Sequence, residues 1–247
     1  MESVPVTSRR FYGKKLPRVN LTALKGKLIV IEGADGSGRS TQIAMLRDWL
    51  ERLGYATVNV GLKRSMLVGE ALEEAKKGNV LGPTTRSLFY ATDFVDQLEN
   101  KIIPGLRSGF VVLADRYIYT LMARDIVRGA DADWIKAVYS IALVPDAVFY
   151  LWVSPKVLAQ RNLLKNSVLD YWESGMDIRR SGDMHECFIR YQSRIQTIFR
   201  SMQRVYGFHT INGNRSPRVI SQELQAKVEA VLNPAARAAT GSERIVS

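Results

Sequence analysis

The chain has 247 residues, of which 46% are hydrophobic and 24% charged, and its formal net charge is +11. This composition is that of a globular protein, and one domain of this length can bury a large core. No uninterrupted apolar stretch approaches the roughly 18 residues of a bilayer-spanning helix, so we expect no membrane segment. The single cysteine, Cys187, excludes an internal disulfide and fits a cytoplasmic protein, and with only two histidines a dedicated zinc site is not expected.

The positive charge is concentrated near the N-terminus. Residues 1–27 contain seven basic side chains and one acidic side chain. Segments of this kind bind nucleic acid or membrane surfaces in some proteins, but they are more often solvated tails. This one lacks the interleaved aromatic residues of a base-stacking surface, apart from Phe11 and Tyr12. We therefore interpret residues 1–26 as a solvated basic arm and expect no nucleic-acid partner.

Strand and helix patterns alternate from residue 27 to residue 232. The apolar, β-branched run 28–31 predicts a buried strand, and a glycine-rich turn leads to a helix over 40–53 with apolar residues at helical spacing. The remaining predicted strands cover 57–60, 110–114, 148–153 and 208–211. The remaining predicted helices cover 67–77, 83–103, 154–165, 184–206 and 217–232, and Pro104 is expected to end the second of these.

This alternation predicts one α/β domain over residues 27–232. Strands that alternate with helices form a parallel, doubly wound sheet, here of five strands with helices on both faces. Such an arrangement is the three-layer αβα fold. The segment 233–247 is rich in Ala, Arg and Ser and is expected to be a frayed tail.

The turn after the first strand has the pattern of a phosphate-binding loop. Its residues, Gly33-Ala34-Asp35-Gly36-Ser37-Gly38-Arg39-Ser40, match G-x-x-x-x-G-K-[ST], except that an arginine takes the lysine position. The glycines let backbone N–H groups point inward around phosphate oxygens, and the next helix presents its positive N-terminus to the same anion. We expect this loop, with Thr41, to bind ATP, and the Ser40 hydroxyl to bind Mg²⁺.

Arg39 keeps the positive charge of a lysine but carries it on a planar fork of five donors. One misplaced charge-assisted contact costs about 1.5–3 kcal/mol, which corresponds to a loss of roughly 10- to 100-fold in rate. We therefore expect Arg39 to support slow turnover rather than none.

Asp115 stands at the C-terminal end of the predicted strand 110–114. A carboxylate in this place, on a strand beside the phosphate-binding loop, can hold Mg²⁺ directly or through water. The alternative is an aspartate that only caps the next turn. Arg116 and Tyr117 follow it directly.

Three segments make the chain resemble the thymidylate kinases, a family of P-loop nucleoside monophosphate kinases. Residues 31–42 are similar to the family's EGxDGxGKSTQ, residues 83–93 (PTTRSLFYATD) to its P-x-T-x-x-L-L-F-A-A-D, and residues 115–117 to its DRY. The resemblance covers residues 27–232. It implies the P-loop NTPase fold and the transfer of the γ-phosphate of ATP to a nucleoside monophosphate such as dTMP.

The resemblance also implies roles for individual residues. Arg116 would hold the acceptor phosphate, Asp35 would lie between donor and acceptor, and Tyr90 would take the place of the phenylalanine that stacks on the acceptor base. Asn212 would help to frame adenine. A homodimer is a further expectation, with the helix over 83–103 as its interface.

Residues 166–182 occupy the place of the family's lid, which closes over the phosphates. Gly36 follows Asp35, so the loop itself offers no catalytic arginine there, and a lid arginine is expected instead. The candidates are Arg161, Arg179 and Arg180. The acidic residues of this region are expected to order the lid as hydrogen-bond partners; they are Asp170, Glu173, Asp177 and Asp183.

The acceptor side departs from the family pattern. The R-E-P motif is missing and residues 61–63 take its place, so Lys63 and Arg64 are either substitute phosphate ligands or surface charges. The family's base-reading arginine falls on Phe94, and its polar base-edge residues fall on Leu121 and Arg124.

Three functions stay open because of these departures. The first is a thymidylate-kinase-like nucleotide kinase. The second is a kinase of the same fold with another acceptor, such as a nucleoside or polyphosphate. The third is a degenerate nucleotide-binding sensor or interaction protein.

Overall fold

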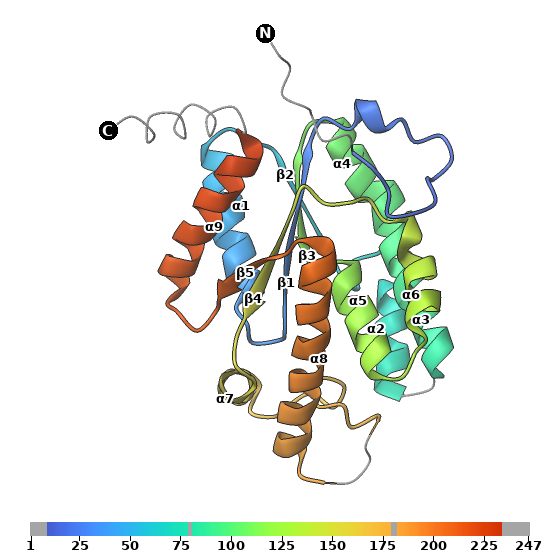
Figure 1. The fold of residues 1–247 in the computed structure, drawn as a ribbon, viewed down its shortest axis with the longest axis vertical. Helices are drawn as coiled ribbons and strands as arrows, with labels where there is room; N and C mark the ends of the chain where they lie inside the picture. The colour runs from blue at the N-terminus through green and yellow to red at the C-terminus, as the bar shows by residue number, and fades with distance from the viewer. Residues whose placement is uncertain (1–8, 79–80, 179–181, 234–247) are drawn as a thin grey trace.

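The computed structural model of the chain describes residues 9–78, 81–178 and 182–233. Five strands form one parallel sheet in the order β2-β3-β1-β4-β5 (Figure 1). The five-stranded parallel sheet predicted from the sequence is confirmed, and each predicted strand end lies within two residues of the observed one. The strands are β1 (Lys27–Gly33), β2 (Thr57–Gly61), β3 (Val111–Asp115), β4 (Ala147–Trp152) and β5 (His209–Asn212).

Helices fill the connections between the strands. Among the described helices, none combines the length and the apolarity that crossing a bilayer requires. The predicted helices over 184–206 and 217–232 match the structure at both ends. The helical elements are η1 (Leu21–Ala23), α1 (Arg39–Arg52), α2 (Gly69–Gly78), α3 (Pro83–Gln97), η2 (Leu98–Ile102), α4 (Ile103–Arg107), α5 (Ile118–Val127), α6 (Ala132–Val138), η3 (Tyr139–Ile141), α7 (Pro155–Asn166), α8 (Met184–Tyr206) and α9 (Pro217–Leu232).

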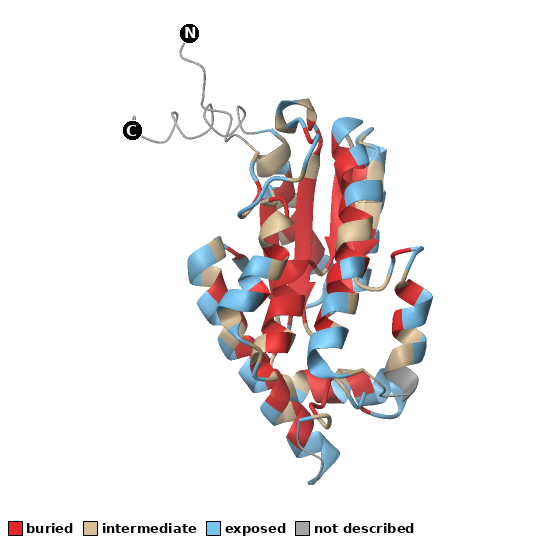
Figure 2. Cartoon of the chain, turned by 90° about the vertical axis from the view of Figure 1, so that its right-hand side faces the viewer, coloured by how far each residue is buried: buried red, intermediate tan, exposed pale blue. Residues whose placement is uncertain are grey.

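The sheet has a hydrophobic core on each face because successive strand residues point to opposite sides. Ile29 and Ile31 of β1 belong to a core that they share with α1 and α9. Leu28 and Val30 of the same strand belong to a larger core shared with α3, α5 and α8. Figure 1 shows α1 and α9 on one side of the sheet and α3 to α6 on the other, and Figure 2 shows the buried strands between helices that are exposed on their outer faces. The predicted three-layer αβα arrangement is therefore confirmed.

The prediction that Pro104 ends the helix begun at Pro83 is wrong. The chain continues from α3 through η2, a π-helix, into α4, whose first turn contains Pro104. In η2 the N–H of Ile103 donates to the carbonyl of Leu98, five residues back. A proline is tolerated in the first turn of a helix, where its missing N–H needs no partner. The wider π turn gives Pro104 such a position inside a continuous helical segment.

Residues 9–26 pack against the domain, so for this part of the chain the interpretation as a solvated arm is wrong. Phe11 is 8% exposed and forms an isolated antiparallel bridge with the segment before β4. Arg9 donates a hydrogen bond of 2.9 Å to the carboxylate of Asp146. The apolar residues of the segment thus complete the larger core. The first eight residues and the predicted tail from residue 234 onward lie outside the described part of the chain.

Replacing Phe11 by alanine should lower the free energy of unfolding by about 3 kcal/mol, because the substitution removes a buried ring from the larger core. Chemical denaturation monitored by circular dichroism measures this loss. Leu53→Ala is the control, since Leu53 is 54% exposed and its truncation should change stability by less than about 0.5 kcal/mol. Equal small effects of both substitutions would show that the segment does not contribute to the fold.

Candidate functional site

The predicted phosphate-binding loop lies in a strand-to-helix corner between β1 and α1. Gly33, Gly36 and Gly38 have φ angles of +153°, +82° and +92°, in the region that favours glycine. A side chain on Gly36 would come within 2.7 Å of the Asn162 amide nitrogen. The first N–H groups of α1 have no partner within the helix and are available to an anion at this corner.

Arg39 turns its guanidinium toward the oxygens of this corner. Its Nε donates to Asp115 at 2.8 Å, and its Nη1 donates to the carbonyls of Gly33 and Ala34 at 2.5 Å each. Its Nη2 lies 3.2 Å from an Asp35 carboxylate oxygen. Burial disfavours the charge, but the two carboxylates outweigh burial and raise the pKa of Arg39 above its usual value. The side chain at the lysine position therefore links β1, β3 and the loop.

Asp115 ends β3 directly beside Ile31 of β1, as predicted for a carboxylate next to the loop. Burial acts to raise the pKa of this carboxyl, but the neighbouring Arg39 outweighs burial and leaves the pKa below its usual value. The Ser40 hydroxyl lies 3.4 Å from Asp115 Oδ2, and Arg64 lies 3.5 Å from the same oxygen. An ionised carboxylate and a hydroxyl thus face each other at the start of α1.

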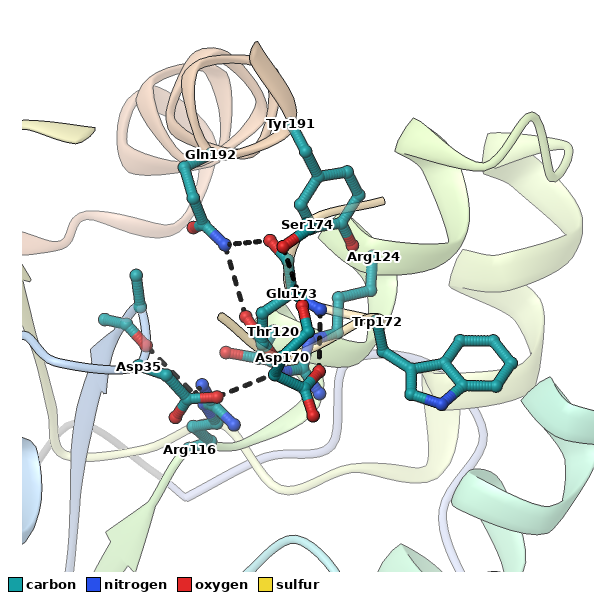
Figure 3. Close-up of polar contacts among 12 residues, drawn as sticks. Asp35, Arg116, Thr120, Arg124, Asp170, Trp172, Glu173, Ser174, Tyr191 and Gln192 are labelled. Atoms are coloured by element: carbon teal, nitrogen blue, oxygen red, sulfur yellow. Dashed lines mark hydrogen bonds and ion pairs between the residues drawn. The ribbon is translucent and has the colours of Figure 1, made fainter. Parts of the chain in front are cut away.

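Asp35 is surrounded by arginines. Arg116 donates to it at 2.8 Å and Arg124 lies at 4.0 Å (Figure 3). Arg39 lies 3.2 Å from the same carboxylate. Burial opposes ionisation of Asp35, yet the arginines hold its pKa well below the usual range. Three guanidinium groups around one carboxylate leave an excess of positive charge, which suits the binding of phosphate groups.

Glu32 holds the turn that carries Arg116, and sequence analysis did not assign it a role. Its carboxyl accepts from the backbone N–H groups of Tyr117 and Thr120 at 2.9 and 3.2 Å, and from the Thr120 hydroxyl at 2.5 Å. These contacts cap the N-terminus of α5, and they fix Arg116 in a left-handed conformation with φ of +69°. The available signal was a single charged residue at the end of an otherwise apolar strand.

A cavity with about 430 Å³ of empty space, part of it open to solvent, lies on the acceptor side between α3, α5 and the segment before α8. Tyr90, predicted to stack on a base, lines it. A second, smaller cavity extends to Gly33, Ala34 and Arg116 at the phosphate-binding corner. The larger cavity is lined by Arg86, Tyr90, Leu121, Arg124, Asp125, Arg128, Trp172 and Glu173.

Comparison with known proteins places this geometry in a family. The family model for thymidylate kinase matches residues 31–223. That match takes in the loop, Asp115, Arg116 and both cavities.

The chain belongs to the thymidylate kinase family.

Individual relatives agree with this assignment. The chain is 43% identical over 195 residues to the probable thymidylate kinase 2 of Saccharolobus solfataricus, across 78% of this chain and 90% of the relative. It is 27% identical over 202 residues to the thymidylate kinase of Brachyspira hyodysenteriae, across 81% and 92% of the two chains. It is 30% identical over 154 residues to the probable thymidylate kinase of Pyrococcus horikoshii, across 60% and 75%. As a member of this family, the chain is a nucleotide kinase with ATP as its phosphoryl donor.

Only some of the residues predicted to bind the acceptor lie near the cavity or the catalytic corner. Phe94 is 5% exposed and packs edge-on against Tyr117 and Tyr139, so it lies in the core rather than in the cavity. Lys63 pairs with Glu73. Gly61, the first residue in place of the R-E-P motif, pairs in register with Asp115 of β3, and Arg64, just after that segment, lies 3.5 Å from an Asp115 carboxylate oxygen.

On the donor side, Arg161 lies against the phosphate-binding loop. Its Nη1 donates to the carbonyls of Gly36 and Gly213 at 3.3 and 3.1 Å. Asn212 accepts from the N–H of Asn214 at 3.0 Å and so closes the turn after β5. The described hydrogen bonds of the Arg161 guanidinium are therefore to backbone carbonyls of the loop and of the turn after β5.

The acidic residues of the predicted lid are hydrogen-bond partners, as expected. Glu173 pairs with Arg124, and Asp177 pairs with Arg128 at 2.7 Å. Asp183 accepts from the backbone N–H of Glu186 and caps α8, and Asp170 accepts from the N–H of Glu173. The two predicted lid arginines, Arg179 and Arg180, lie outside the described residues.

Glu32 gives a pH-dependent prediction. Its burial raises its pKa in the folded protein above the ordinary value of 4.5. The unfolded chain therefore loses this proton first as pH rises. Stability that depends on protonated Glu32 is fully present below pH 4.5 and is lost as pH rises toward the folded-state pKa.

Glu32→Gln keeps a neutral hydrogen-bonding group at this position. The free energy of unfolding of the wild type should fall relative to this variant as pH is raised from about 4 to 8. Denaturant titrations of both proteins at several pH values measure the difference. A difference that stays constant across this range would contradict the raised pKa.

Proposed function

We propose that this protein transfers the γ-phosphoryl group of ATP to dTMP, which gives dTDP and ADP. One observation carries the proposal: the phosphate-binding corner and the cavity lined by Tyr90 share the cationic cluster around Asp35. Arg116 and Arg124, which contact Asp35, line the cavity that reaches the loop. A triphosphate on one side of this cluster and a monophosphate on the other would place donor and acceptor next to each other.

The donor site is supported by the loop and the start of α1. Backbone N–H groups of residues 33–41 would surround the β- and γ-phosphates, and the helix N-terminus would add its partial positive charge. Asn212, close to this corner at the end of β5, would border the adenine. Since the described guanidinium contacts of Arg161 are to Gly36 and Gly213, it would brace the loop that holds the nucleotide.

Mg²⁺ would be held by Ser40 and Asp115. Their facing oxygens are of the type that Mg²⁺ prefers, and this ion usually takes one or two protein ligands together with phosphate and water oxygens. The described residues contain no group of three or more His, Cys, Asp or Glu side chains suited to a metal, which agrees with such a shared site. When bound, the ion would neutralise phosphate charge. The bond from Arg39 to the other Asp115 oxygen would orient the carboxylate.

The acceptor site is supported by Tyr90, Arg116 and Arg64. Arg116, held by the Glu32-capped turn, would bind the acceptor phosphate. Arg64 would approach the same phosphate from the loop after β2, in place of the missing R-E-P motif. Tyr90 would stack on the base inside the cavity, a contact worth about 1–3 kcal/mol for an aromatic ring.

Residues 166–182 would act as the lid of the reaction. Phosphoryl transfer needs positioning and neutralisation of charge more than acid or base catalysis, and an inserted arginine can raise its rate by several orders of magnitude. Arg179 and Arg180 are the proposed suppliers of that charge. Closure of the lid would also exclude water, which protects ATP from hydrolysis.

A homodimer and a cytoplasmic location complete the proposal. Leu88 on α3 is apolar and 46% exposed, which supports the predicted interface at residues 83–103. Met66 and Leu67, in the loop between β2 and α2, are also exposed. A free, buried Cys187 fits a reducing compartment. Neither a different acceptor nor a sensor role is favoured by a specific contact in the site.

A panel of acceptors tests the proposed reaction. With ATP and Mg²⁺, kcat/KM should be highest for dTMP among nucleoside monophosphates, nucleosides and polyphosphate, as followed by ADP formation. Asp115→Ala should lower the rate by about 100-fold or more, because it removes a charged group from the transferring phosphates. Asp48→Ala, at an exposed position of α1, is the control. A higher kcat/KM for a nucleoside or polyphosphate would show that dTMP is not the acceptor. No turnover of any acceptor would favour a nucleotide-binding sensor over a kinase.

Arg39→Lys should raise kcat about tenfold or more. A lysine ammonium is a compact charge that cannot bridge Asp115 and the loop carbonyls simultaneously, so it is freer to follow the phosphate. Steady-state kinetics with saturating ATP and dTMP measure the change. Arg47→Lys, an exposed replacement on the same helix, is the matched control. An unchanged or lower kcat in Arg39→Lys would show that the arginine is adapted to its place.

A further inference from the structure

A small hydrophobic cluster, separate from the two cores of the sheet, connects the phosphate-binding loop with α7 and α8. Ala34 of the loop packs against it. Figure 1 shows α7 at the same end of the sheet as the corner between β1 and α1. The helix is thereby held beside the loop by apolar contacts of its own. The buried members of the cluster are Val153, Leu158, Ala159, Leu169 and Phe188.

Two adjacent side chains of α7 bind two successive carbonyl groups of the loop. Asn162 Nδ2 donates to the carbonyl of Asp35 at 2.9 Å, and Arg161 Nη1 donates to the carbonyl of Gly36 at 3.3 Å. The approach is close, because a Cβ on Gly36 would lie 2.7 Å from Asn162 Nδ2 and 3.4 Å from the carbonyl oxygen of Leu158. Only a glycine therefore fits between the loop and the helix.

Asn162 can act on a ligand only through the loop. An amide side chain has two N–H donors, and the second one of Asn162 goes to the carbonyl of Leu158 at 2.9 Å. The residue is 7% exposed and carries no charge. Both of its donors are thus used within the protein, and no donor is left for a phosphate group.

The contact with Asn162 fixes the direction of one loop N–H. In a trans peptide unit the C=O and the N–H point in opposite directions. Since the carbonyl of Asp35 is directed at α7, the N–H of Gly36 points away from α7. N–H groups of this kind surround the phosphate oxygens in a phosphate-binding loop. The carboxylate of Asp35 is held separately, by Arg116 at 2.8 Å.

We propose that Asn162 is a positioning residue for the donor nucleotide, because it holds the Asp35 carbonyl and so directs the N–H of Gly36 at a phosphate of ATP; this inference rests on the proposed function. Without Asn162, the peptide unit between these two residues can rotate, since a glycine permits many backbone conformations. A carbonyl oxygen that turned inward would repel a phosphate. The effect should therefore fall on the donor and not on dTMP.

Asn162→Leu tests the proposal, because leucine keeps the branched shape of asparagine and removes the donor. In calorimetric titrations, the Kd for ADP with Mg²⁺ should rise about tenfold or more, since a hydrogen bond to a charged group is lost. The Kd for dTMP should change by less than about twofold. Gln160→Leu is the matched control, because it removes an exposed amide from the same helix. Asn162→Ala and Gln160→Ala repeat the comparison with a smaller side chain.

Amide NMR separates this role from a purely structural one. At saturating ADP with Mg²⁺, the amide resonance of Gly36 in the wild type should shift, because its N–H then donates to a phosphate. In Asn162→Leu most of this shift should be lost. The shift of Gly38, whose peptide unit Asn162 does not contact, should remain.

Three results would overturn the inference: a Gly36 shift that is retained in full, an equal loss of affinity for ADP and dTMP, or a failure of both Asn162 variants to fold. The titrations with ADP require no phosphoryl transfer, so they separate this inference from the proposed function. A chain that binds ADP through Asn162 but does not phosphorylate dTMP would contradict the reaction and retain the inference. A dTMP kinase whose affinity for ADP is independent of Asn162 would do the reverse.

Discussion

The structure depends on the way charges are neutralised where β1 and β3 end. Arg39 joins Asp115, Asp35 and two loop carbonyls in a place that is mostly removed from water. Charges in such a place are tolerated only when they are paired and hydrogen-bonded. The same arginines and carboxylates that satisfy each other here are the groups that phosphates and Mg²⁺ require. Binding of nucleotide therefore exchanges one set of charge partners for another.

Two buried carboxyl groups position the arginines around Asp35 and Asp115 by binding the backbone of the turns that carry them. Glu32 caps α5 from inside the sheet and so fixes the backbone of Arg116. Asp93 of α3 accepts from the N–H groups of Lys63 and Ser65 at 2.8 and 2.9 Å and holds the loop that carries Arg64. Each buried carboxyl acts on a backbone segment, and the segment presents an arginine to the site. The positions of the cations are thus determined by polar contacts one layer below them.

Most of the fold could be predicted from the sequence, because apolar runs such as 28–31 and apolar residues at helical spacing such as those in 184–206 indicate strands and helices directly. The phosphate-binding corner was equally predictable, since its glycines need a backbone conformation that few other residues adopt. The path through Pro104 was not, because a π turn leaves no pattern in a single sequence. The packing of residues 9–26 was missed for a related reason: its six basic side chains dominate the composition and drew attention away from the apolar ones, Phe11 among them, that pack in the core.

The acceptor side shows where sequence reasoning stops. Tyr90 was found because a motif marks it, but Trp172, Arg86 and Arg128 come from separate segments and meet only in three dimensions. Phe94 lies one helical turn beyond Tyr90 and was predicted to contact the acceptor, but it packs in the core against Tyr117. Spacing along a helix does not reveal which neighbouring elements cover each of its faces. Pairings such as Arg124 with Glu173, which are 49 residues apart, are set by the packing of α8 on α5.

The segment before β1 runs along the opposite end of the sheet from the catalytic corner (Figure 1). There Arg9 and the N–H of Leu28 both bind Asp146, just before β4 begins. The groups that bind nucleotide thus lie at one end of the sheet, and the contacts that hold the N-terminal segment to the domain lie at the other. A change in the charge of its exposed residues, such as Lys14 and Lys15, would therefore leave the groups around the phosphates in place.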